Sequence, residues 1–254
     1  MKYTDELDLQ NFKKVNTASW EGMKDNVFVR LINKKYLSSY GDIAYVPFMD
    51  LAITFSVQEK NKGSIVSHLL TNEELENMNI SVSEAKQVAL KNTTNDRKRR
   101  LLTMKESTIK DDMMYPILQI PEGMMIGAGG KGPQSCGIIV DTEENRDNVL
   151  ILCNKDGAFG ASYMTVFSVL NEIYERFGCE NFYIVPLSVH EIMCIRVGYV
   201  THEGEKPLQE VEDDLLTMIE SFNDSSNNSW KNILTYKIYL YYGDDGNKLF
   251  LING

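Results

Sequence analysis

The sequence has few of the residues from which metal and disulfide sites are built. It contains three histidines and four cysteines, Cys136, Cys153, Cys179 and Cys194, and no two of the cysteines form a CxxC pair. Structural zinc sites usually place cysteines about two to four residues apart, so this spacing disfavours one. Three of the cysteines lie in or beside apolar segments, so we expect reduced thiols of the kind found in cytoplasmic proteins, and neither a metal nor another cofactor.

Long hydrophobic runs are also lacking. No apolar run approaches the ~18 residues that a membrane span requires. Residues 1–6 (MKYTDE) are acidic and are not followed by the apolar core of a secretory signal. We therefore expect a cytoplasmic protein that is not associated with a membrane.

Positive charge is scarce, and the formal net charge is −10. Because nucleic-acid binding depends largely on neutralising phosphates, this net charge disfavours nucleic acid as a partner. One basic run, residues 97–100 (RKRR), interrupts the pattern. A solvated surface is the simpler interpretation of this run, and a local acidic partner or RNA contact is the alternative.

The chain of 254 residues is long enough for one large domain or two smaller ones. Short strand patterns are interleaved with helical ones, which predicts an α+β fold with a mixed, mainly antiparallel sheet flanked by helices. We expect two loosely separated lobes, residues 1–110 and 111–254, joined near residues 105–135.

The N-terminal lobe is predicted to contain strands over residues 26–33 and 64–69 and, between them, a long strand-like run over residues 43–57 that is interrupted by Pro47 and Asp50. A turn at residues 61–63 should join this run to the last strand. Two helices should follow, because Thr71 with Glu74 and Ser81 with Glu84 have the spacing of capping boxes. Leu101 and Leu102 suggest a weak third helix.

The C-terminal lobe is organised around residues 148–194. The pattern predicts a strand at 149–153, a small-residue turn at 154–162, a helix at 164–177 and a second strand at 181–185, which could be parallel to the first. A second helix after Pro207 and a closing hairpin ending near residue 252 complete the lobe. The glycine-rich segment 123–137 matches neither a phosphate-binding loop nor a dinucleotide fingerprint, so we expect a hairpin tip or interlobe loop.

Candidate binding residues follow the two predicted central strands: Asn154 and Asp156 after the first, and Ser188, His190 and Glu191 after the second. If the strands are parallel, these side chains lie at one edge of the sheet, where His190 could act as a general base. The alternatives are an Asx-type turn at Asn154 and a structural histidine whose ring caps a loop carbonyl, with Glu191 exposed. No residue is assigned as catalytic.

Several blocks resemble an uncharacterised family of low-GC Gram-positive bacteria, catalogued as a domain of unknown function. The resemblance covers roughly residues 5–250 and is carried by residues 23–36 (MKDNVFVRLINKKY), 47–55 (PFMDLAITF), 70–93, 152–164 (LCNKDGAFGASYM) and 182–193 (FYIVPLSVHEIM). It implies a cytoplasmic protein without an assigned activity, in a family whose members often carry a further N-terminal domain. This chain departs from the family at Met78-Asn79, where Trp-Gly is usual, and at Leu187, which replaces the first of two serines.

Three functions are compatible with these patterns. The first is a non-enzymatic interaction or regulatory protein with an unknown protein partner. The second is a small-molecule hydrolase or ligand-binding protein centred on His190 and Glu191. The third is an acidic mimic of nucleic acid from a phage or mobile element. The sequence does not specify the oligomeric state.

Overall fold

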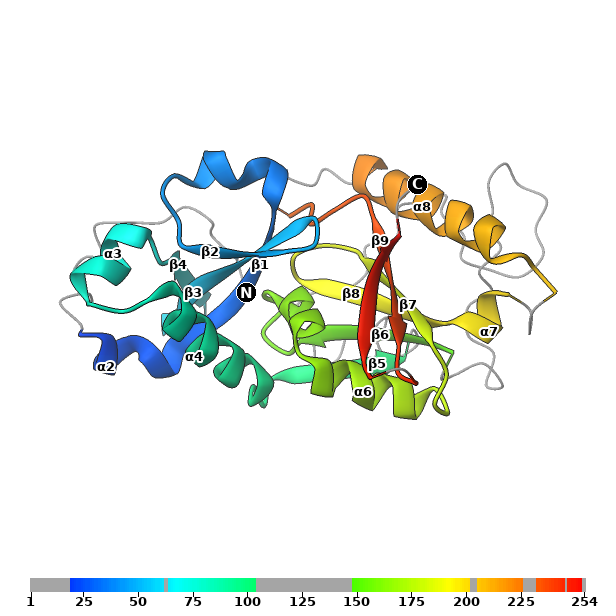
Figure 1. Ribbon diagram of the computed structural model, residues 1–254, viewed down its shortest axis with the longest axis horizontal. Coiled ribbons are helices and arrows are strands. Elements are labelled where there is room, and N and C mark those ends of the chain that lie inside the picture. Colours follow the sequence, from blue (N-terminus) through cyan, green and yellow to red (C-terminus); the bar gives the residue numbers. More distant parts are fainter. Residues whose placement is uncertain are drawn as a thin grey trace. The chain divides into compact units, whose positions relative to one another are not determined.

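The computed structural model describes residues 19–61, 64–103, 148–201, 205–225, 232–244 and 246–252. The chain divides into two compact units, Met1–Lys98 and Arg99–Gly254, which are coloured from blue to red along the sequence in Figure 1. The lobe boundary expected at residues 110–111 and the glycine-rich segment 123–137 lie outside the described residues, and both stay predictions.

The first unit contains an antiparallel sheet with β3 as its central strand. Strand β1 pairs with one edge of β3, while β2 and β4 follow one another along the opposite edge. The strands are β1 (Val27–Asn33), β2 (Tyr45–Phe48), β3 (Leu51–Asn61) and β4 (Ser64–Leu69). The strand-like run predicted over residues 43–57 is divided into β2 and β3, because a turn at Met49, where φ is 53°, reverses the chain beside Asp50, one of the two residues at which an interruption was predicted.

Side chains of helix α4 form hydrogen bonds with the backbone of β1 along the edge that does not pair with β3. The hydroxyl of Thr93 accepts a hydrogen bond from the backbone N–H of Val29 at 3.0 Å, and the amide of Asn92 donates to the carbonyl of Val27 at 2.8 Å. Both predicted helix starts are present: Thr71 and Glu74 form a complete capping box, and the Ser81 hydroxyl accepts from the backbone N–H of Glu84. The helical segments are α2 (Trp20–Met23), η1 (Lys24–Asn26), η2 (Lys34–Tyr40), α3 (Asn72–Asn77) and α4 (Val82–Thr94).

The second unit is built on a larger sheet with the strand order β10-β9-β7-β8-β6-β5. Every strand pairing in the described residues is antiparallel, which confirms the α+β class. The strands are β5 (Arg99–Thr103), β6 (Val149–Asn154), β7 (Phe182–Pro186), β8 (Glu191–Arg196), β9 (Ile238–Tyr242) and β10 (Lys248–Ile252).

Helices pack on both faces of this sheet (Figure 1). On one face, Val211, Leu215 and Ile219 of α8 join a buried cluster with residues of β6, β7, β8 and β9. On the other face, Tyr174 of α6 packs against Tyr241 of β9. The helical segments are η4 (Gly160–Thr165), α6 (Phe167–Arg176), α7 (Val197–Val200) and α8 (Leu208–Ser225). No helix among the described residues combines the length and apolar character needed to cross a membrane.

Three local predictions for this unit need correction. Leu101 and Leu102 lie in strand β5 rather than in a helix, because they pair with Leu152 and Ile151 of β6. The helix predicted over residues 164–177 is divided at Val166, whose backbone is extended, into η4 and α6. The parallel orientation suggested for the two central strands holds for their direction but not for direct pairing, because β8 lies between β6 and β7.

Candidate functional site

The predicted site residues lie where β6 and β7 end and β8 begins. Both β6 and β7 pair antiparallel with β8, so the two strands run in the same direction and end at the same edge of the sheet. The turns at this edge touch: the backbone N–H of Phe159 donates to Nδ1 of His190 at 3.2 Å. A Cβ on Gly160 would lie 2.7 Å from the backbone nitrogen of Asn154, so glycine is required for this close approach.

His190 is held by the turn between β7 and β8. Because its Nδ1 accepts the hydrogen bond from Phe159, the neutral ring carries its proton on Nε2. The backbone N–H of His190 donates to the Ser188 hydroxyl at 3.0 Å, and that of Val189 donates to the carbonyl of Asn232 at 3.0 Å. His190 and Ser188 therefore both contribute to the conformation of the turns in which they lie.

Asn154 ends strand β6 as an Asx turn. Its side-chain oxygen accepts from the backbone N–H of Asp156 at 2.8 Å, and its amide donates to the hydroxyl of Tyr163 at 2.8 Å. The residue is buried, and both ends of its side chain take part in these bonds. The geometry fits the Asx-turn alternative, in which Asn154 positions the chain between β6 and η4.

Glu191 is the first residue of strand β8, and its side chain is largely buried. It is 8% exposed, which corrects the alternative that placed it in solvent. It pairs in register with Cys153, which belongs to the cluster under α8, whereas Asn154, the next residue along β6, points to the opposite face. The sheet therefore separates Glu191 from the Asn154 side chain, and the five candidates do not form one cluster.

The electrostatic environment of Glu191 disfavours both its charge and that of Cys153. Burial raises the pKa of the Glu191 carboxyl well above its ordinary value, and no hydrogen bond or ion pair within the described residues reaches that carboxylate. Burial, and then the nearby Glu191, raise the pKa of Cys153 to about 12, although Arg100 acts in the opposite direction. The Cys153 thiol is therefore protonated at neutral pH and is a poor nucleophile. The described residues contain no group of three or more His, Cys, Asp or Glu side chains suited to a metal ion.

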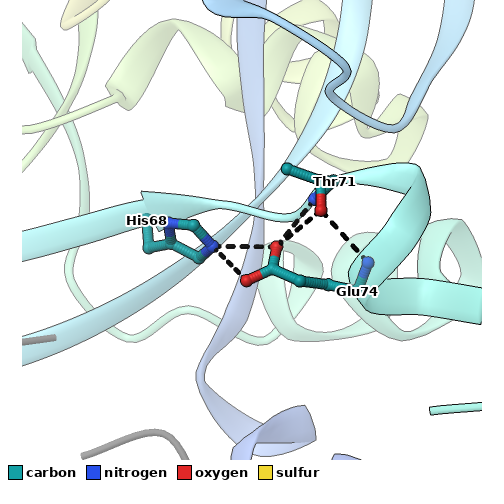
Figure 2. Close-up of polar contacts among 3 residues, drawn as sticks. All are labelled: His68, Thr71 and Glu74. Carbon is teal, nitrogen blue, oxygen red and sulfur yellow. Dashed lines mark hydrogen bonds and ion pairs between the residues drawn. The ribbon is translucent and has the colours of Figure 1, made fainter. Parts of the chain in front are cut away.

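A second polar cluster, which the sequence did not predict, lies in the first unit (Figure 2). The Nε2 atom of His68 lies 2.7 and 2.9 Å from the two carboxylate oxygens of Glu74. Glu74 also accepts from the backbone N–H of Thr71 at 2.9 Å, as part of the capping box of α3. The capping spacing was visible in the sequence, but nothing marked His68, which reaches Glu74 from strand β4.

The charge on Glu74 is favoured by its surroundings. Burial alone would raise the pKa of this carboxyl, but the hydrogen bond with His68 and the backbone and hydroxyl groups of Thr71 outweigh that effect and hold the pKa below its ordinary value. The side chain of His68 is largely buried, and that of Glu74 is about one-third exposed. The cluster joins β4 to the first turn of α3.

The cysteines partly follow expectation. Cys153 and Cys194 are free thiols in the buried strands β6 and β8, but Cys179 is exposed on the turn after α6. Cys136 lies outside the described residues.

Comparison with family models gives a match over most of the chain. The model of a family of unknown function, DUF5688, matches residues 1–242. Neither the curated proteins nor the solved structures include a match to this chain.

Proposed function

We propose that this chain, which belongs to the DUF5688 family of unknown function, is a cytoplasmic interaction protein that binds a protein partner by adding a strand to β10. The main support for this proposal is the apolar character of β10, the strand at the outer edge of the second unit's sheet. Among the described residues β10 pairs with β9 alone, and Phe250 at its centre is 46% exposed. Exposed edge strands present unpaired backbone groups on which another strand can form.

Among the described strands, β4 also pairs with β3 alone, whereas three other edge strands, β1, β2 and β5, carry features that discourage such pairing. Side chains of α4 already bond the backbone of β1. Strand β2 has four residues, and its Pro47 has no N–H to donate. Strand β5 begins with two charged residues, Arg99 and Arg100.

Strand β10 lacks comparable protection. Its sequence is Lys-Leu-Phe-Leu-Ile, so its single charge is at the first position, and Leu249, Leu251 and Ile252 are half-buried. An incoming strand would gain backbone hydrogen bonds and apolar contacts from both faces. These features support β10 as the binding edge.

The alternative of a small-molecule hydrolase or ligand-binding protein has weaker support. Hydrogen-bonding groups of Asn154, Ser188 and His190 take part in local turns, and Glu191 lies on the other face of the sheet. A catalytic or binding set needs side chains that converge on one substrate position.

The test is site-specific photo-crosslinking in cells, with a photoreactive amino acid replacing Phe250. The control replaces Phe167, which is 45% exposed but lies at the start of helix α6. We expect crosslinked protein adducts from position 250 and few from position 167. Equal adducts from the two positions, or none from position 250, would contradict strand addition at β10.

A further inference from the structure

We propose that the strand that adds to β10 is the β10 of a second copy of this chain, related to the first by a twofold axis. This inference rests on the proposed function, because it names the partner of the same edge. Two copies that pair in this way extend one antiparallel sheet from each second unit into the other. Twofold dimers with the same surface on both subunits are the commonest form of protein oligomer.

The sequence of β10 is complementary to itself in an antiparallel pair. With Phe250 on the axis, Leu249 of one copy lies opposite Leu251 of the other, and Lys248 lies opposite Ile252. The triplet Leu-Phe-Leu is the same in both directions. The two lysines are at opposite ends of the pair, about 14 Å apart at about 3.4 Å per residue, so their charges do not meet.

The register of the hairpin shows which side chains would meet. Phe250 pairs with Leu240 of β9, on the face that α8 covers, and its ring packs edge-on against Tyr242 at 5.4 Å between centroids. The two Phe250 rings would extend this aromatic contact across the axis. Leu249 and Leu251 pair with Tyr241 and Tyr239, so their contacts would form on the opposite face.

Pairing with a second copy would explain why strand β10 can remain uncovered within one chain. An exposed apolar strand promotes aggregation unless a partner covers it as soon as the protein folds. A copy of the same chain is always present in equal amount, and each copy offers the same β10 edge. Pairing two of these edges closes the assembly at two subunits, whereas an unclosed contact would build a fibre.

The chain's charge provides a separate criterion. Two copies that each carry a net charge of −10 repel one another, so added salt should screen the repulsion and strengthen the dimer. A basic partner held to the acidic surface would show the reverse dependence.

The first experiment is sedimentation velocity of the full chain over a range of concentrations, with F250K and F167K as matched substitutions of equally exposed phenylalanines. We expect wild type and F167K to sediment at twice the mass of one chain. In F250K two lysines would face each other across the axis, so its dimer dissociation constant should rise at least about tenfold. A monomeric wild type, or an F250K protein that dimerises as tightly as wild type, would overturn the inference. Circular dichroism confirms that each variant is folded.

The second experiment fixes the register by disulfide formation, in a background where Cys136 and Cys179 are replaced by serine. Directly opposed residues have Cα atoms about 4.5–5.5 Å apart, so F250C should crosslink the two copies on mild oxidation. K248C should not, because its partner lies about 14 Å away. Efficient crosslinking of K248C without F250C would overturn this pairing.

The two proposals can fail separately. Photo-crosslinking at position 250 to foreign proteins, with a monomeric wild type, would leave strand addition intact and overturn the second copy. A monomeric wild type with no adducts at position 250 would overturn both.

Discussion

Glu74 in the first unit and Glu191 in the second are both at least partly removed from water, yet their environments act on them in opposite directions. Glu74 accepts hydrogen bonds from His68 and Thr71, and its pKa is lowered. Glu191 is more deeply buried, has no hydrogen-bond partner among the described residues, and its pKa is raised. Burial alone therefore does not determine what a carboxyl group does to stability.

The difference lies in what replaces water around each charge. A buried carboxylate remains ionised when positioned donors compensate for lost hydration, and becomes neutral when they are lacking. Glu74 is at the first turn of α3, where backbone N–H groups point toward it. Glu191 is the first residue of strand β8, whose backbone N–H and C=O groups are directed at the neighbouring strands. These backbone N–H groups therefore do not donate hydrogen bonds to the Glu191 carboxylate.

The largest effect should come from replacing Glu191 with methionine, an apolar side chain of similar volume. E191M removes a carboxyl group whose charged form is disfavoured by burial, so we expect the free energy of unfolding near pH 8 to rise by about 1–3 kcal/mol. Urea denaturation, with hydrogen exchange in peptides from β8, measures this change. E220M serves as the control, because Glu220 is exposed on α8 and its replacement should alter stability by less than about 0.5 kcal/mol. A destabilised E191M protein would mean that the Glu191 carboxylate has a stabilising partner.

Replacing Glu74 with alanine should have the opposite sign. E74A removes half of the capping box and leaves His68 without its carboxylate, so we expect a loss of about 1–2 kcal/mol. Hydrogen exchange in peptides spanning β4 and α3 localises this loss to the first unit.

The matched control for E74A is E84A, because Glu84 occupies the same third position of helix α4. The Ser81 hydroxyl bonds the backbone of residue 84 rather than its side chain, so that cap survives the substitution. Equal losses from E74A and E84A would show that the contacts of the Glu74 carboxylate with His68 and Thr71 add no stability.

Glu74 and Glu191 also show which side-chain contacts can be predicted from the sequence and which cannot. The capping spacing of Thr71 and Glu74 was visible, because a capping box is local and each partner lies within one helical turn of the other. His68 was missed, because its approach depends on where β4 ends. Glu191 was predicted as a partner of His190, but alternation along β8 and pairing with Cys153 place it on the α8 face.

For the fold as well, local features were predicted from the sequence, whereas features that depend on pairing between distant segments were not. The strong helical pattern of α8 and the capped starts of α3 and α4 were identified, as was the α+β class. Strand β5 was assigned to a helix, because its character comes from pairing with β6, a segment distant in the sequence. The insertion of β8 between β6 and β7 was missed for the same reason, since strand order depends on contacts between segments rather than on any one of them.

The smallest expected effect, and the one that tests the comparison in the unmodified protein, is the response of each unit to pH. The lowered pKa of Glu74 means that its stabilisation is present above the unfolded value, about 4.5, and is lost as pH falls through the folded value. The raised pKa of Glu191 means that the second unit loses stability as pH rises above about 4.5 toward the folded value.

On acidification from about pH 7 to about pH 4, these two groups should weaken the first unit and strengthen the second. Urea midpoints of the two units, read separately by pulsed hydrogen exchange and corrected for the intrinsic pH dependence of exchange, measure the responses. The other carboxyl groups contribute to both curves, so the informative quantity is the difference between wild type and E74A or E191M. Each substitution should flatten the pH dependence of its own unit, E74A at the acid end and E191M toward the alkaline end. If E191M left the curve of the second unit unchanged, Glu191 would be ionised in the folded protein, and the contrast between the two carboxyl groups would fail.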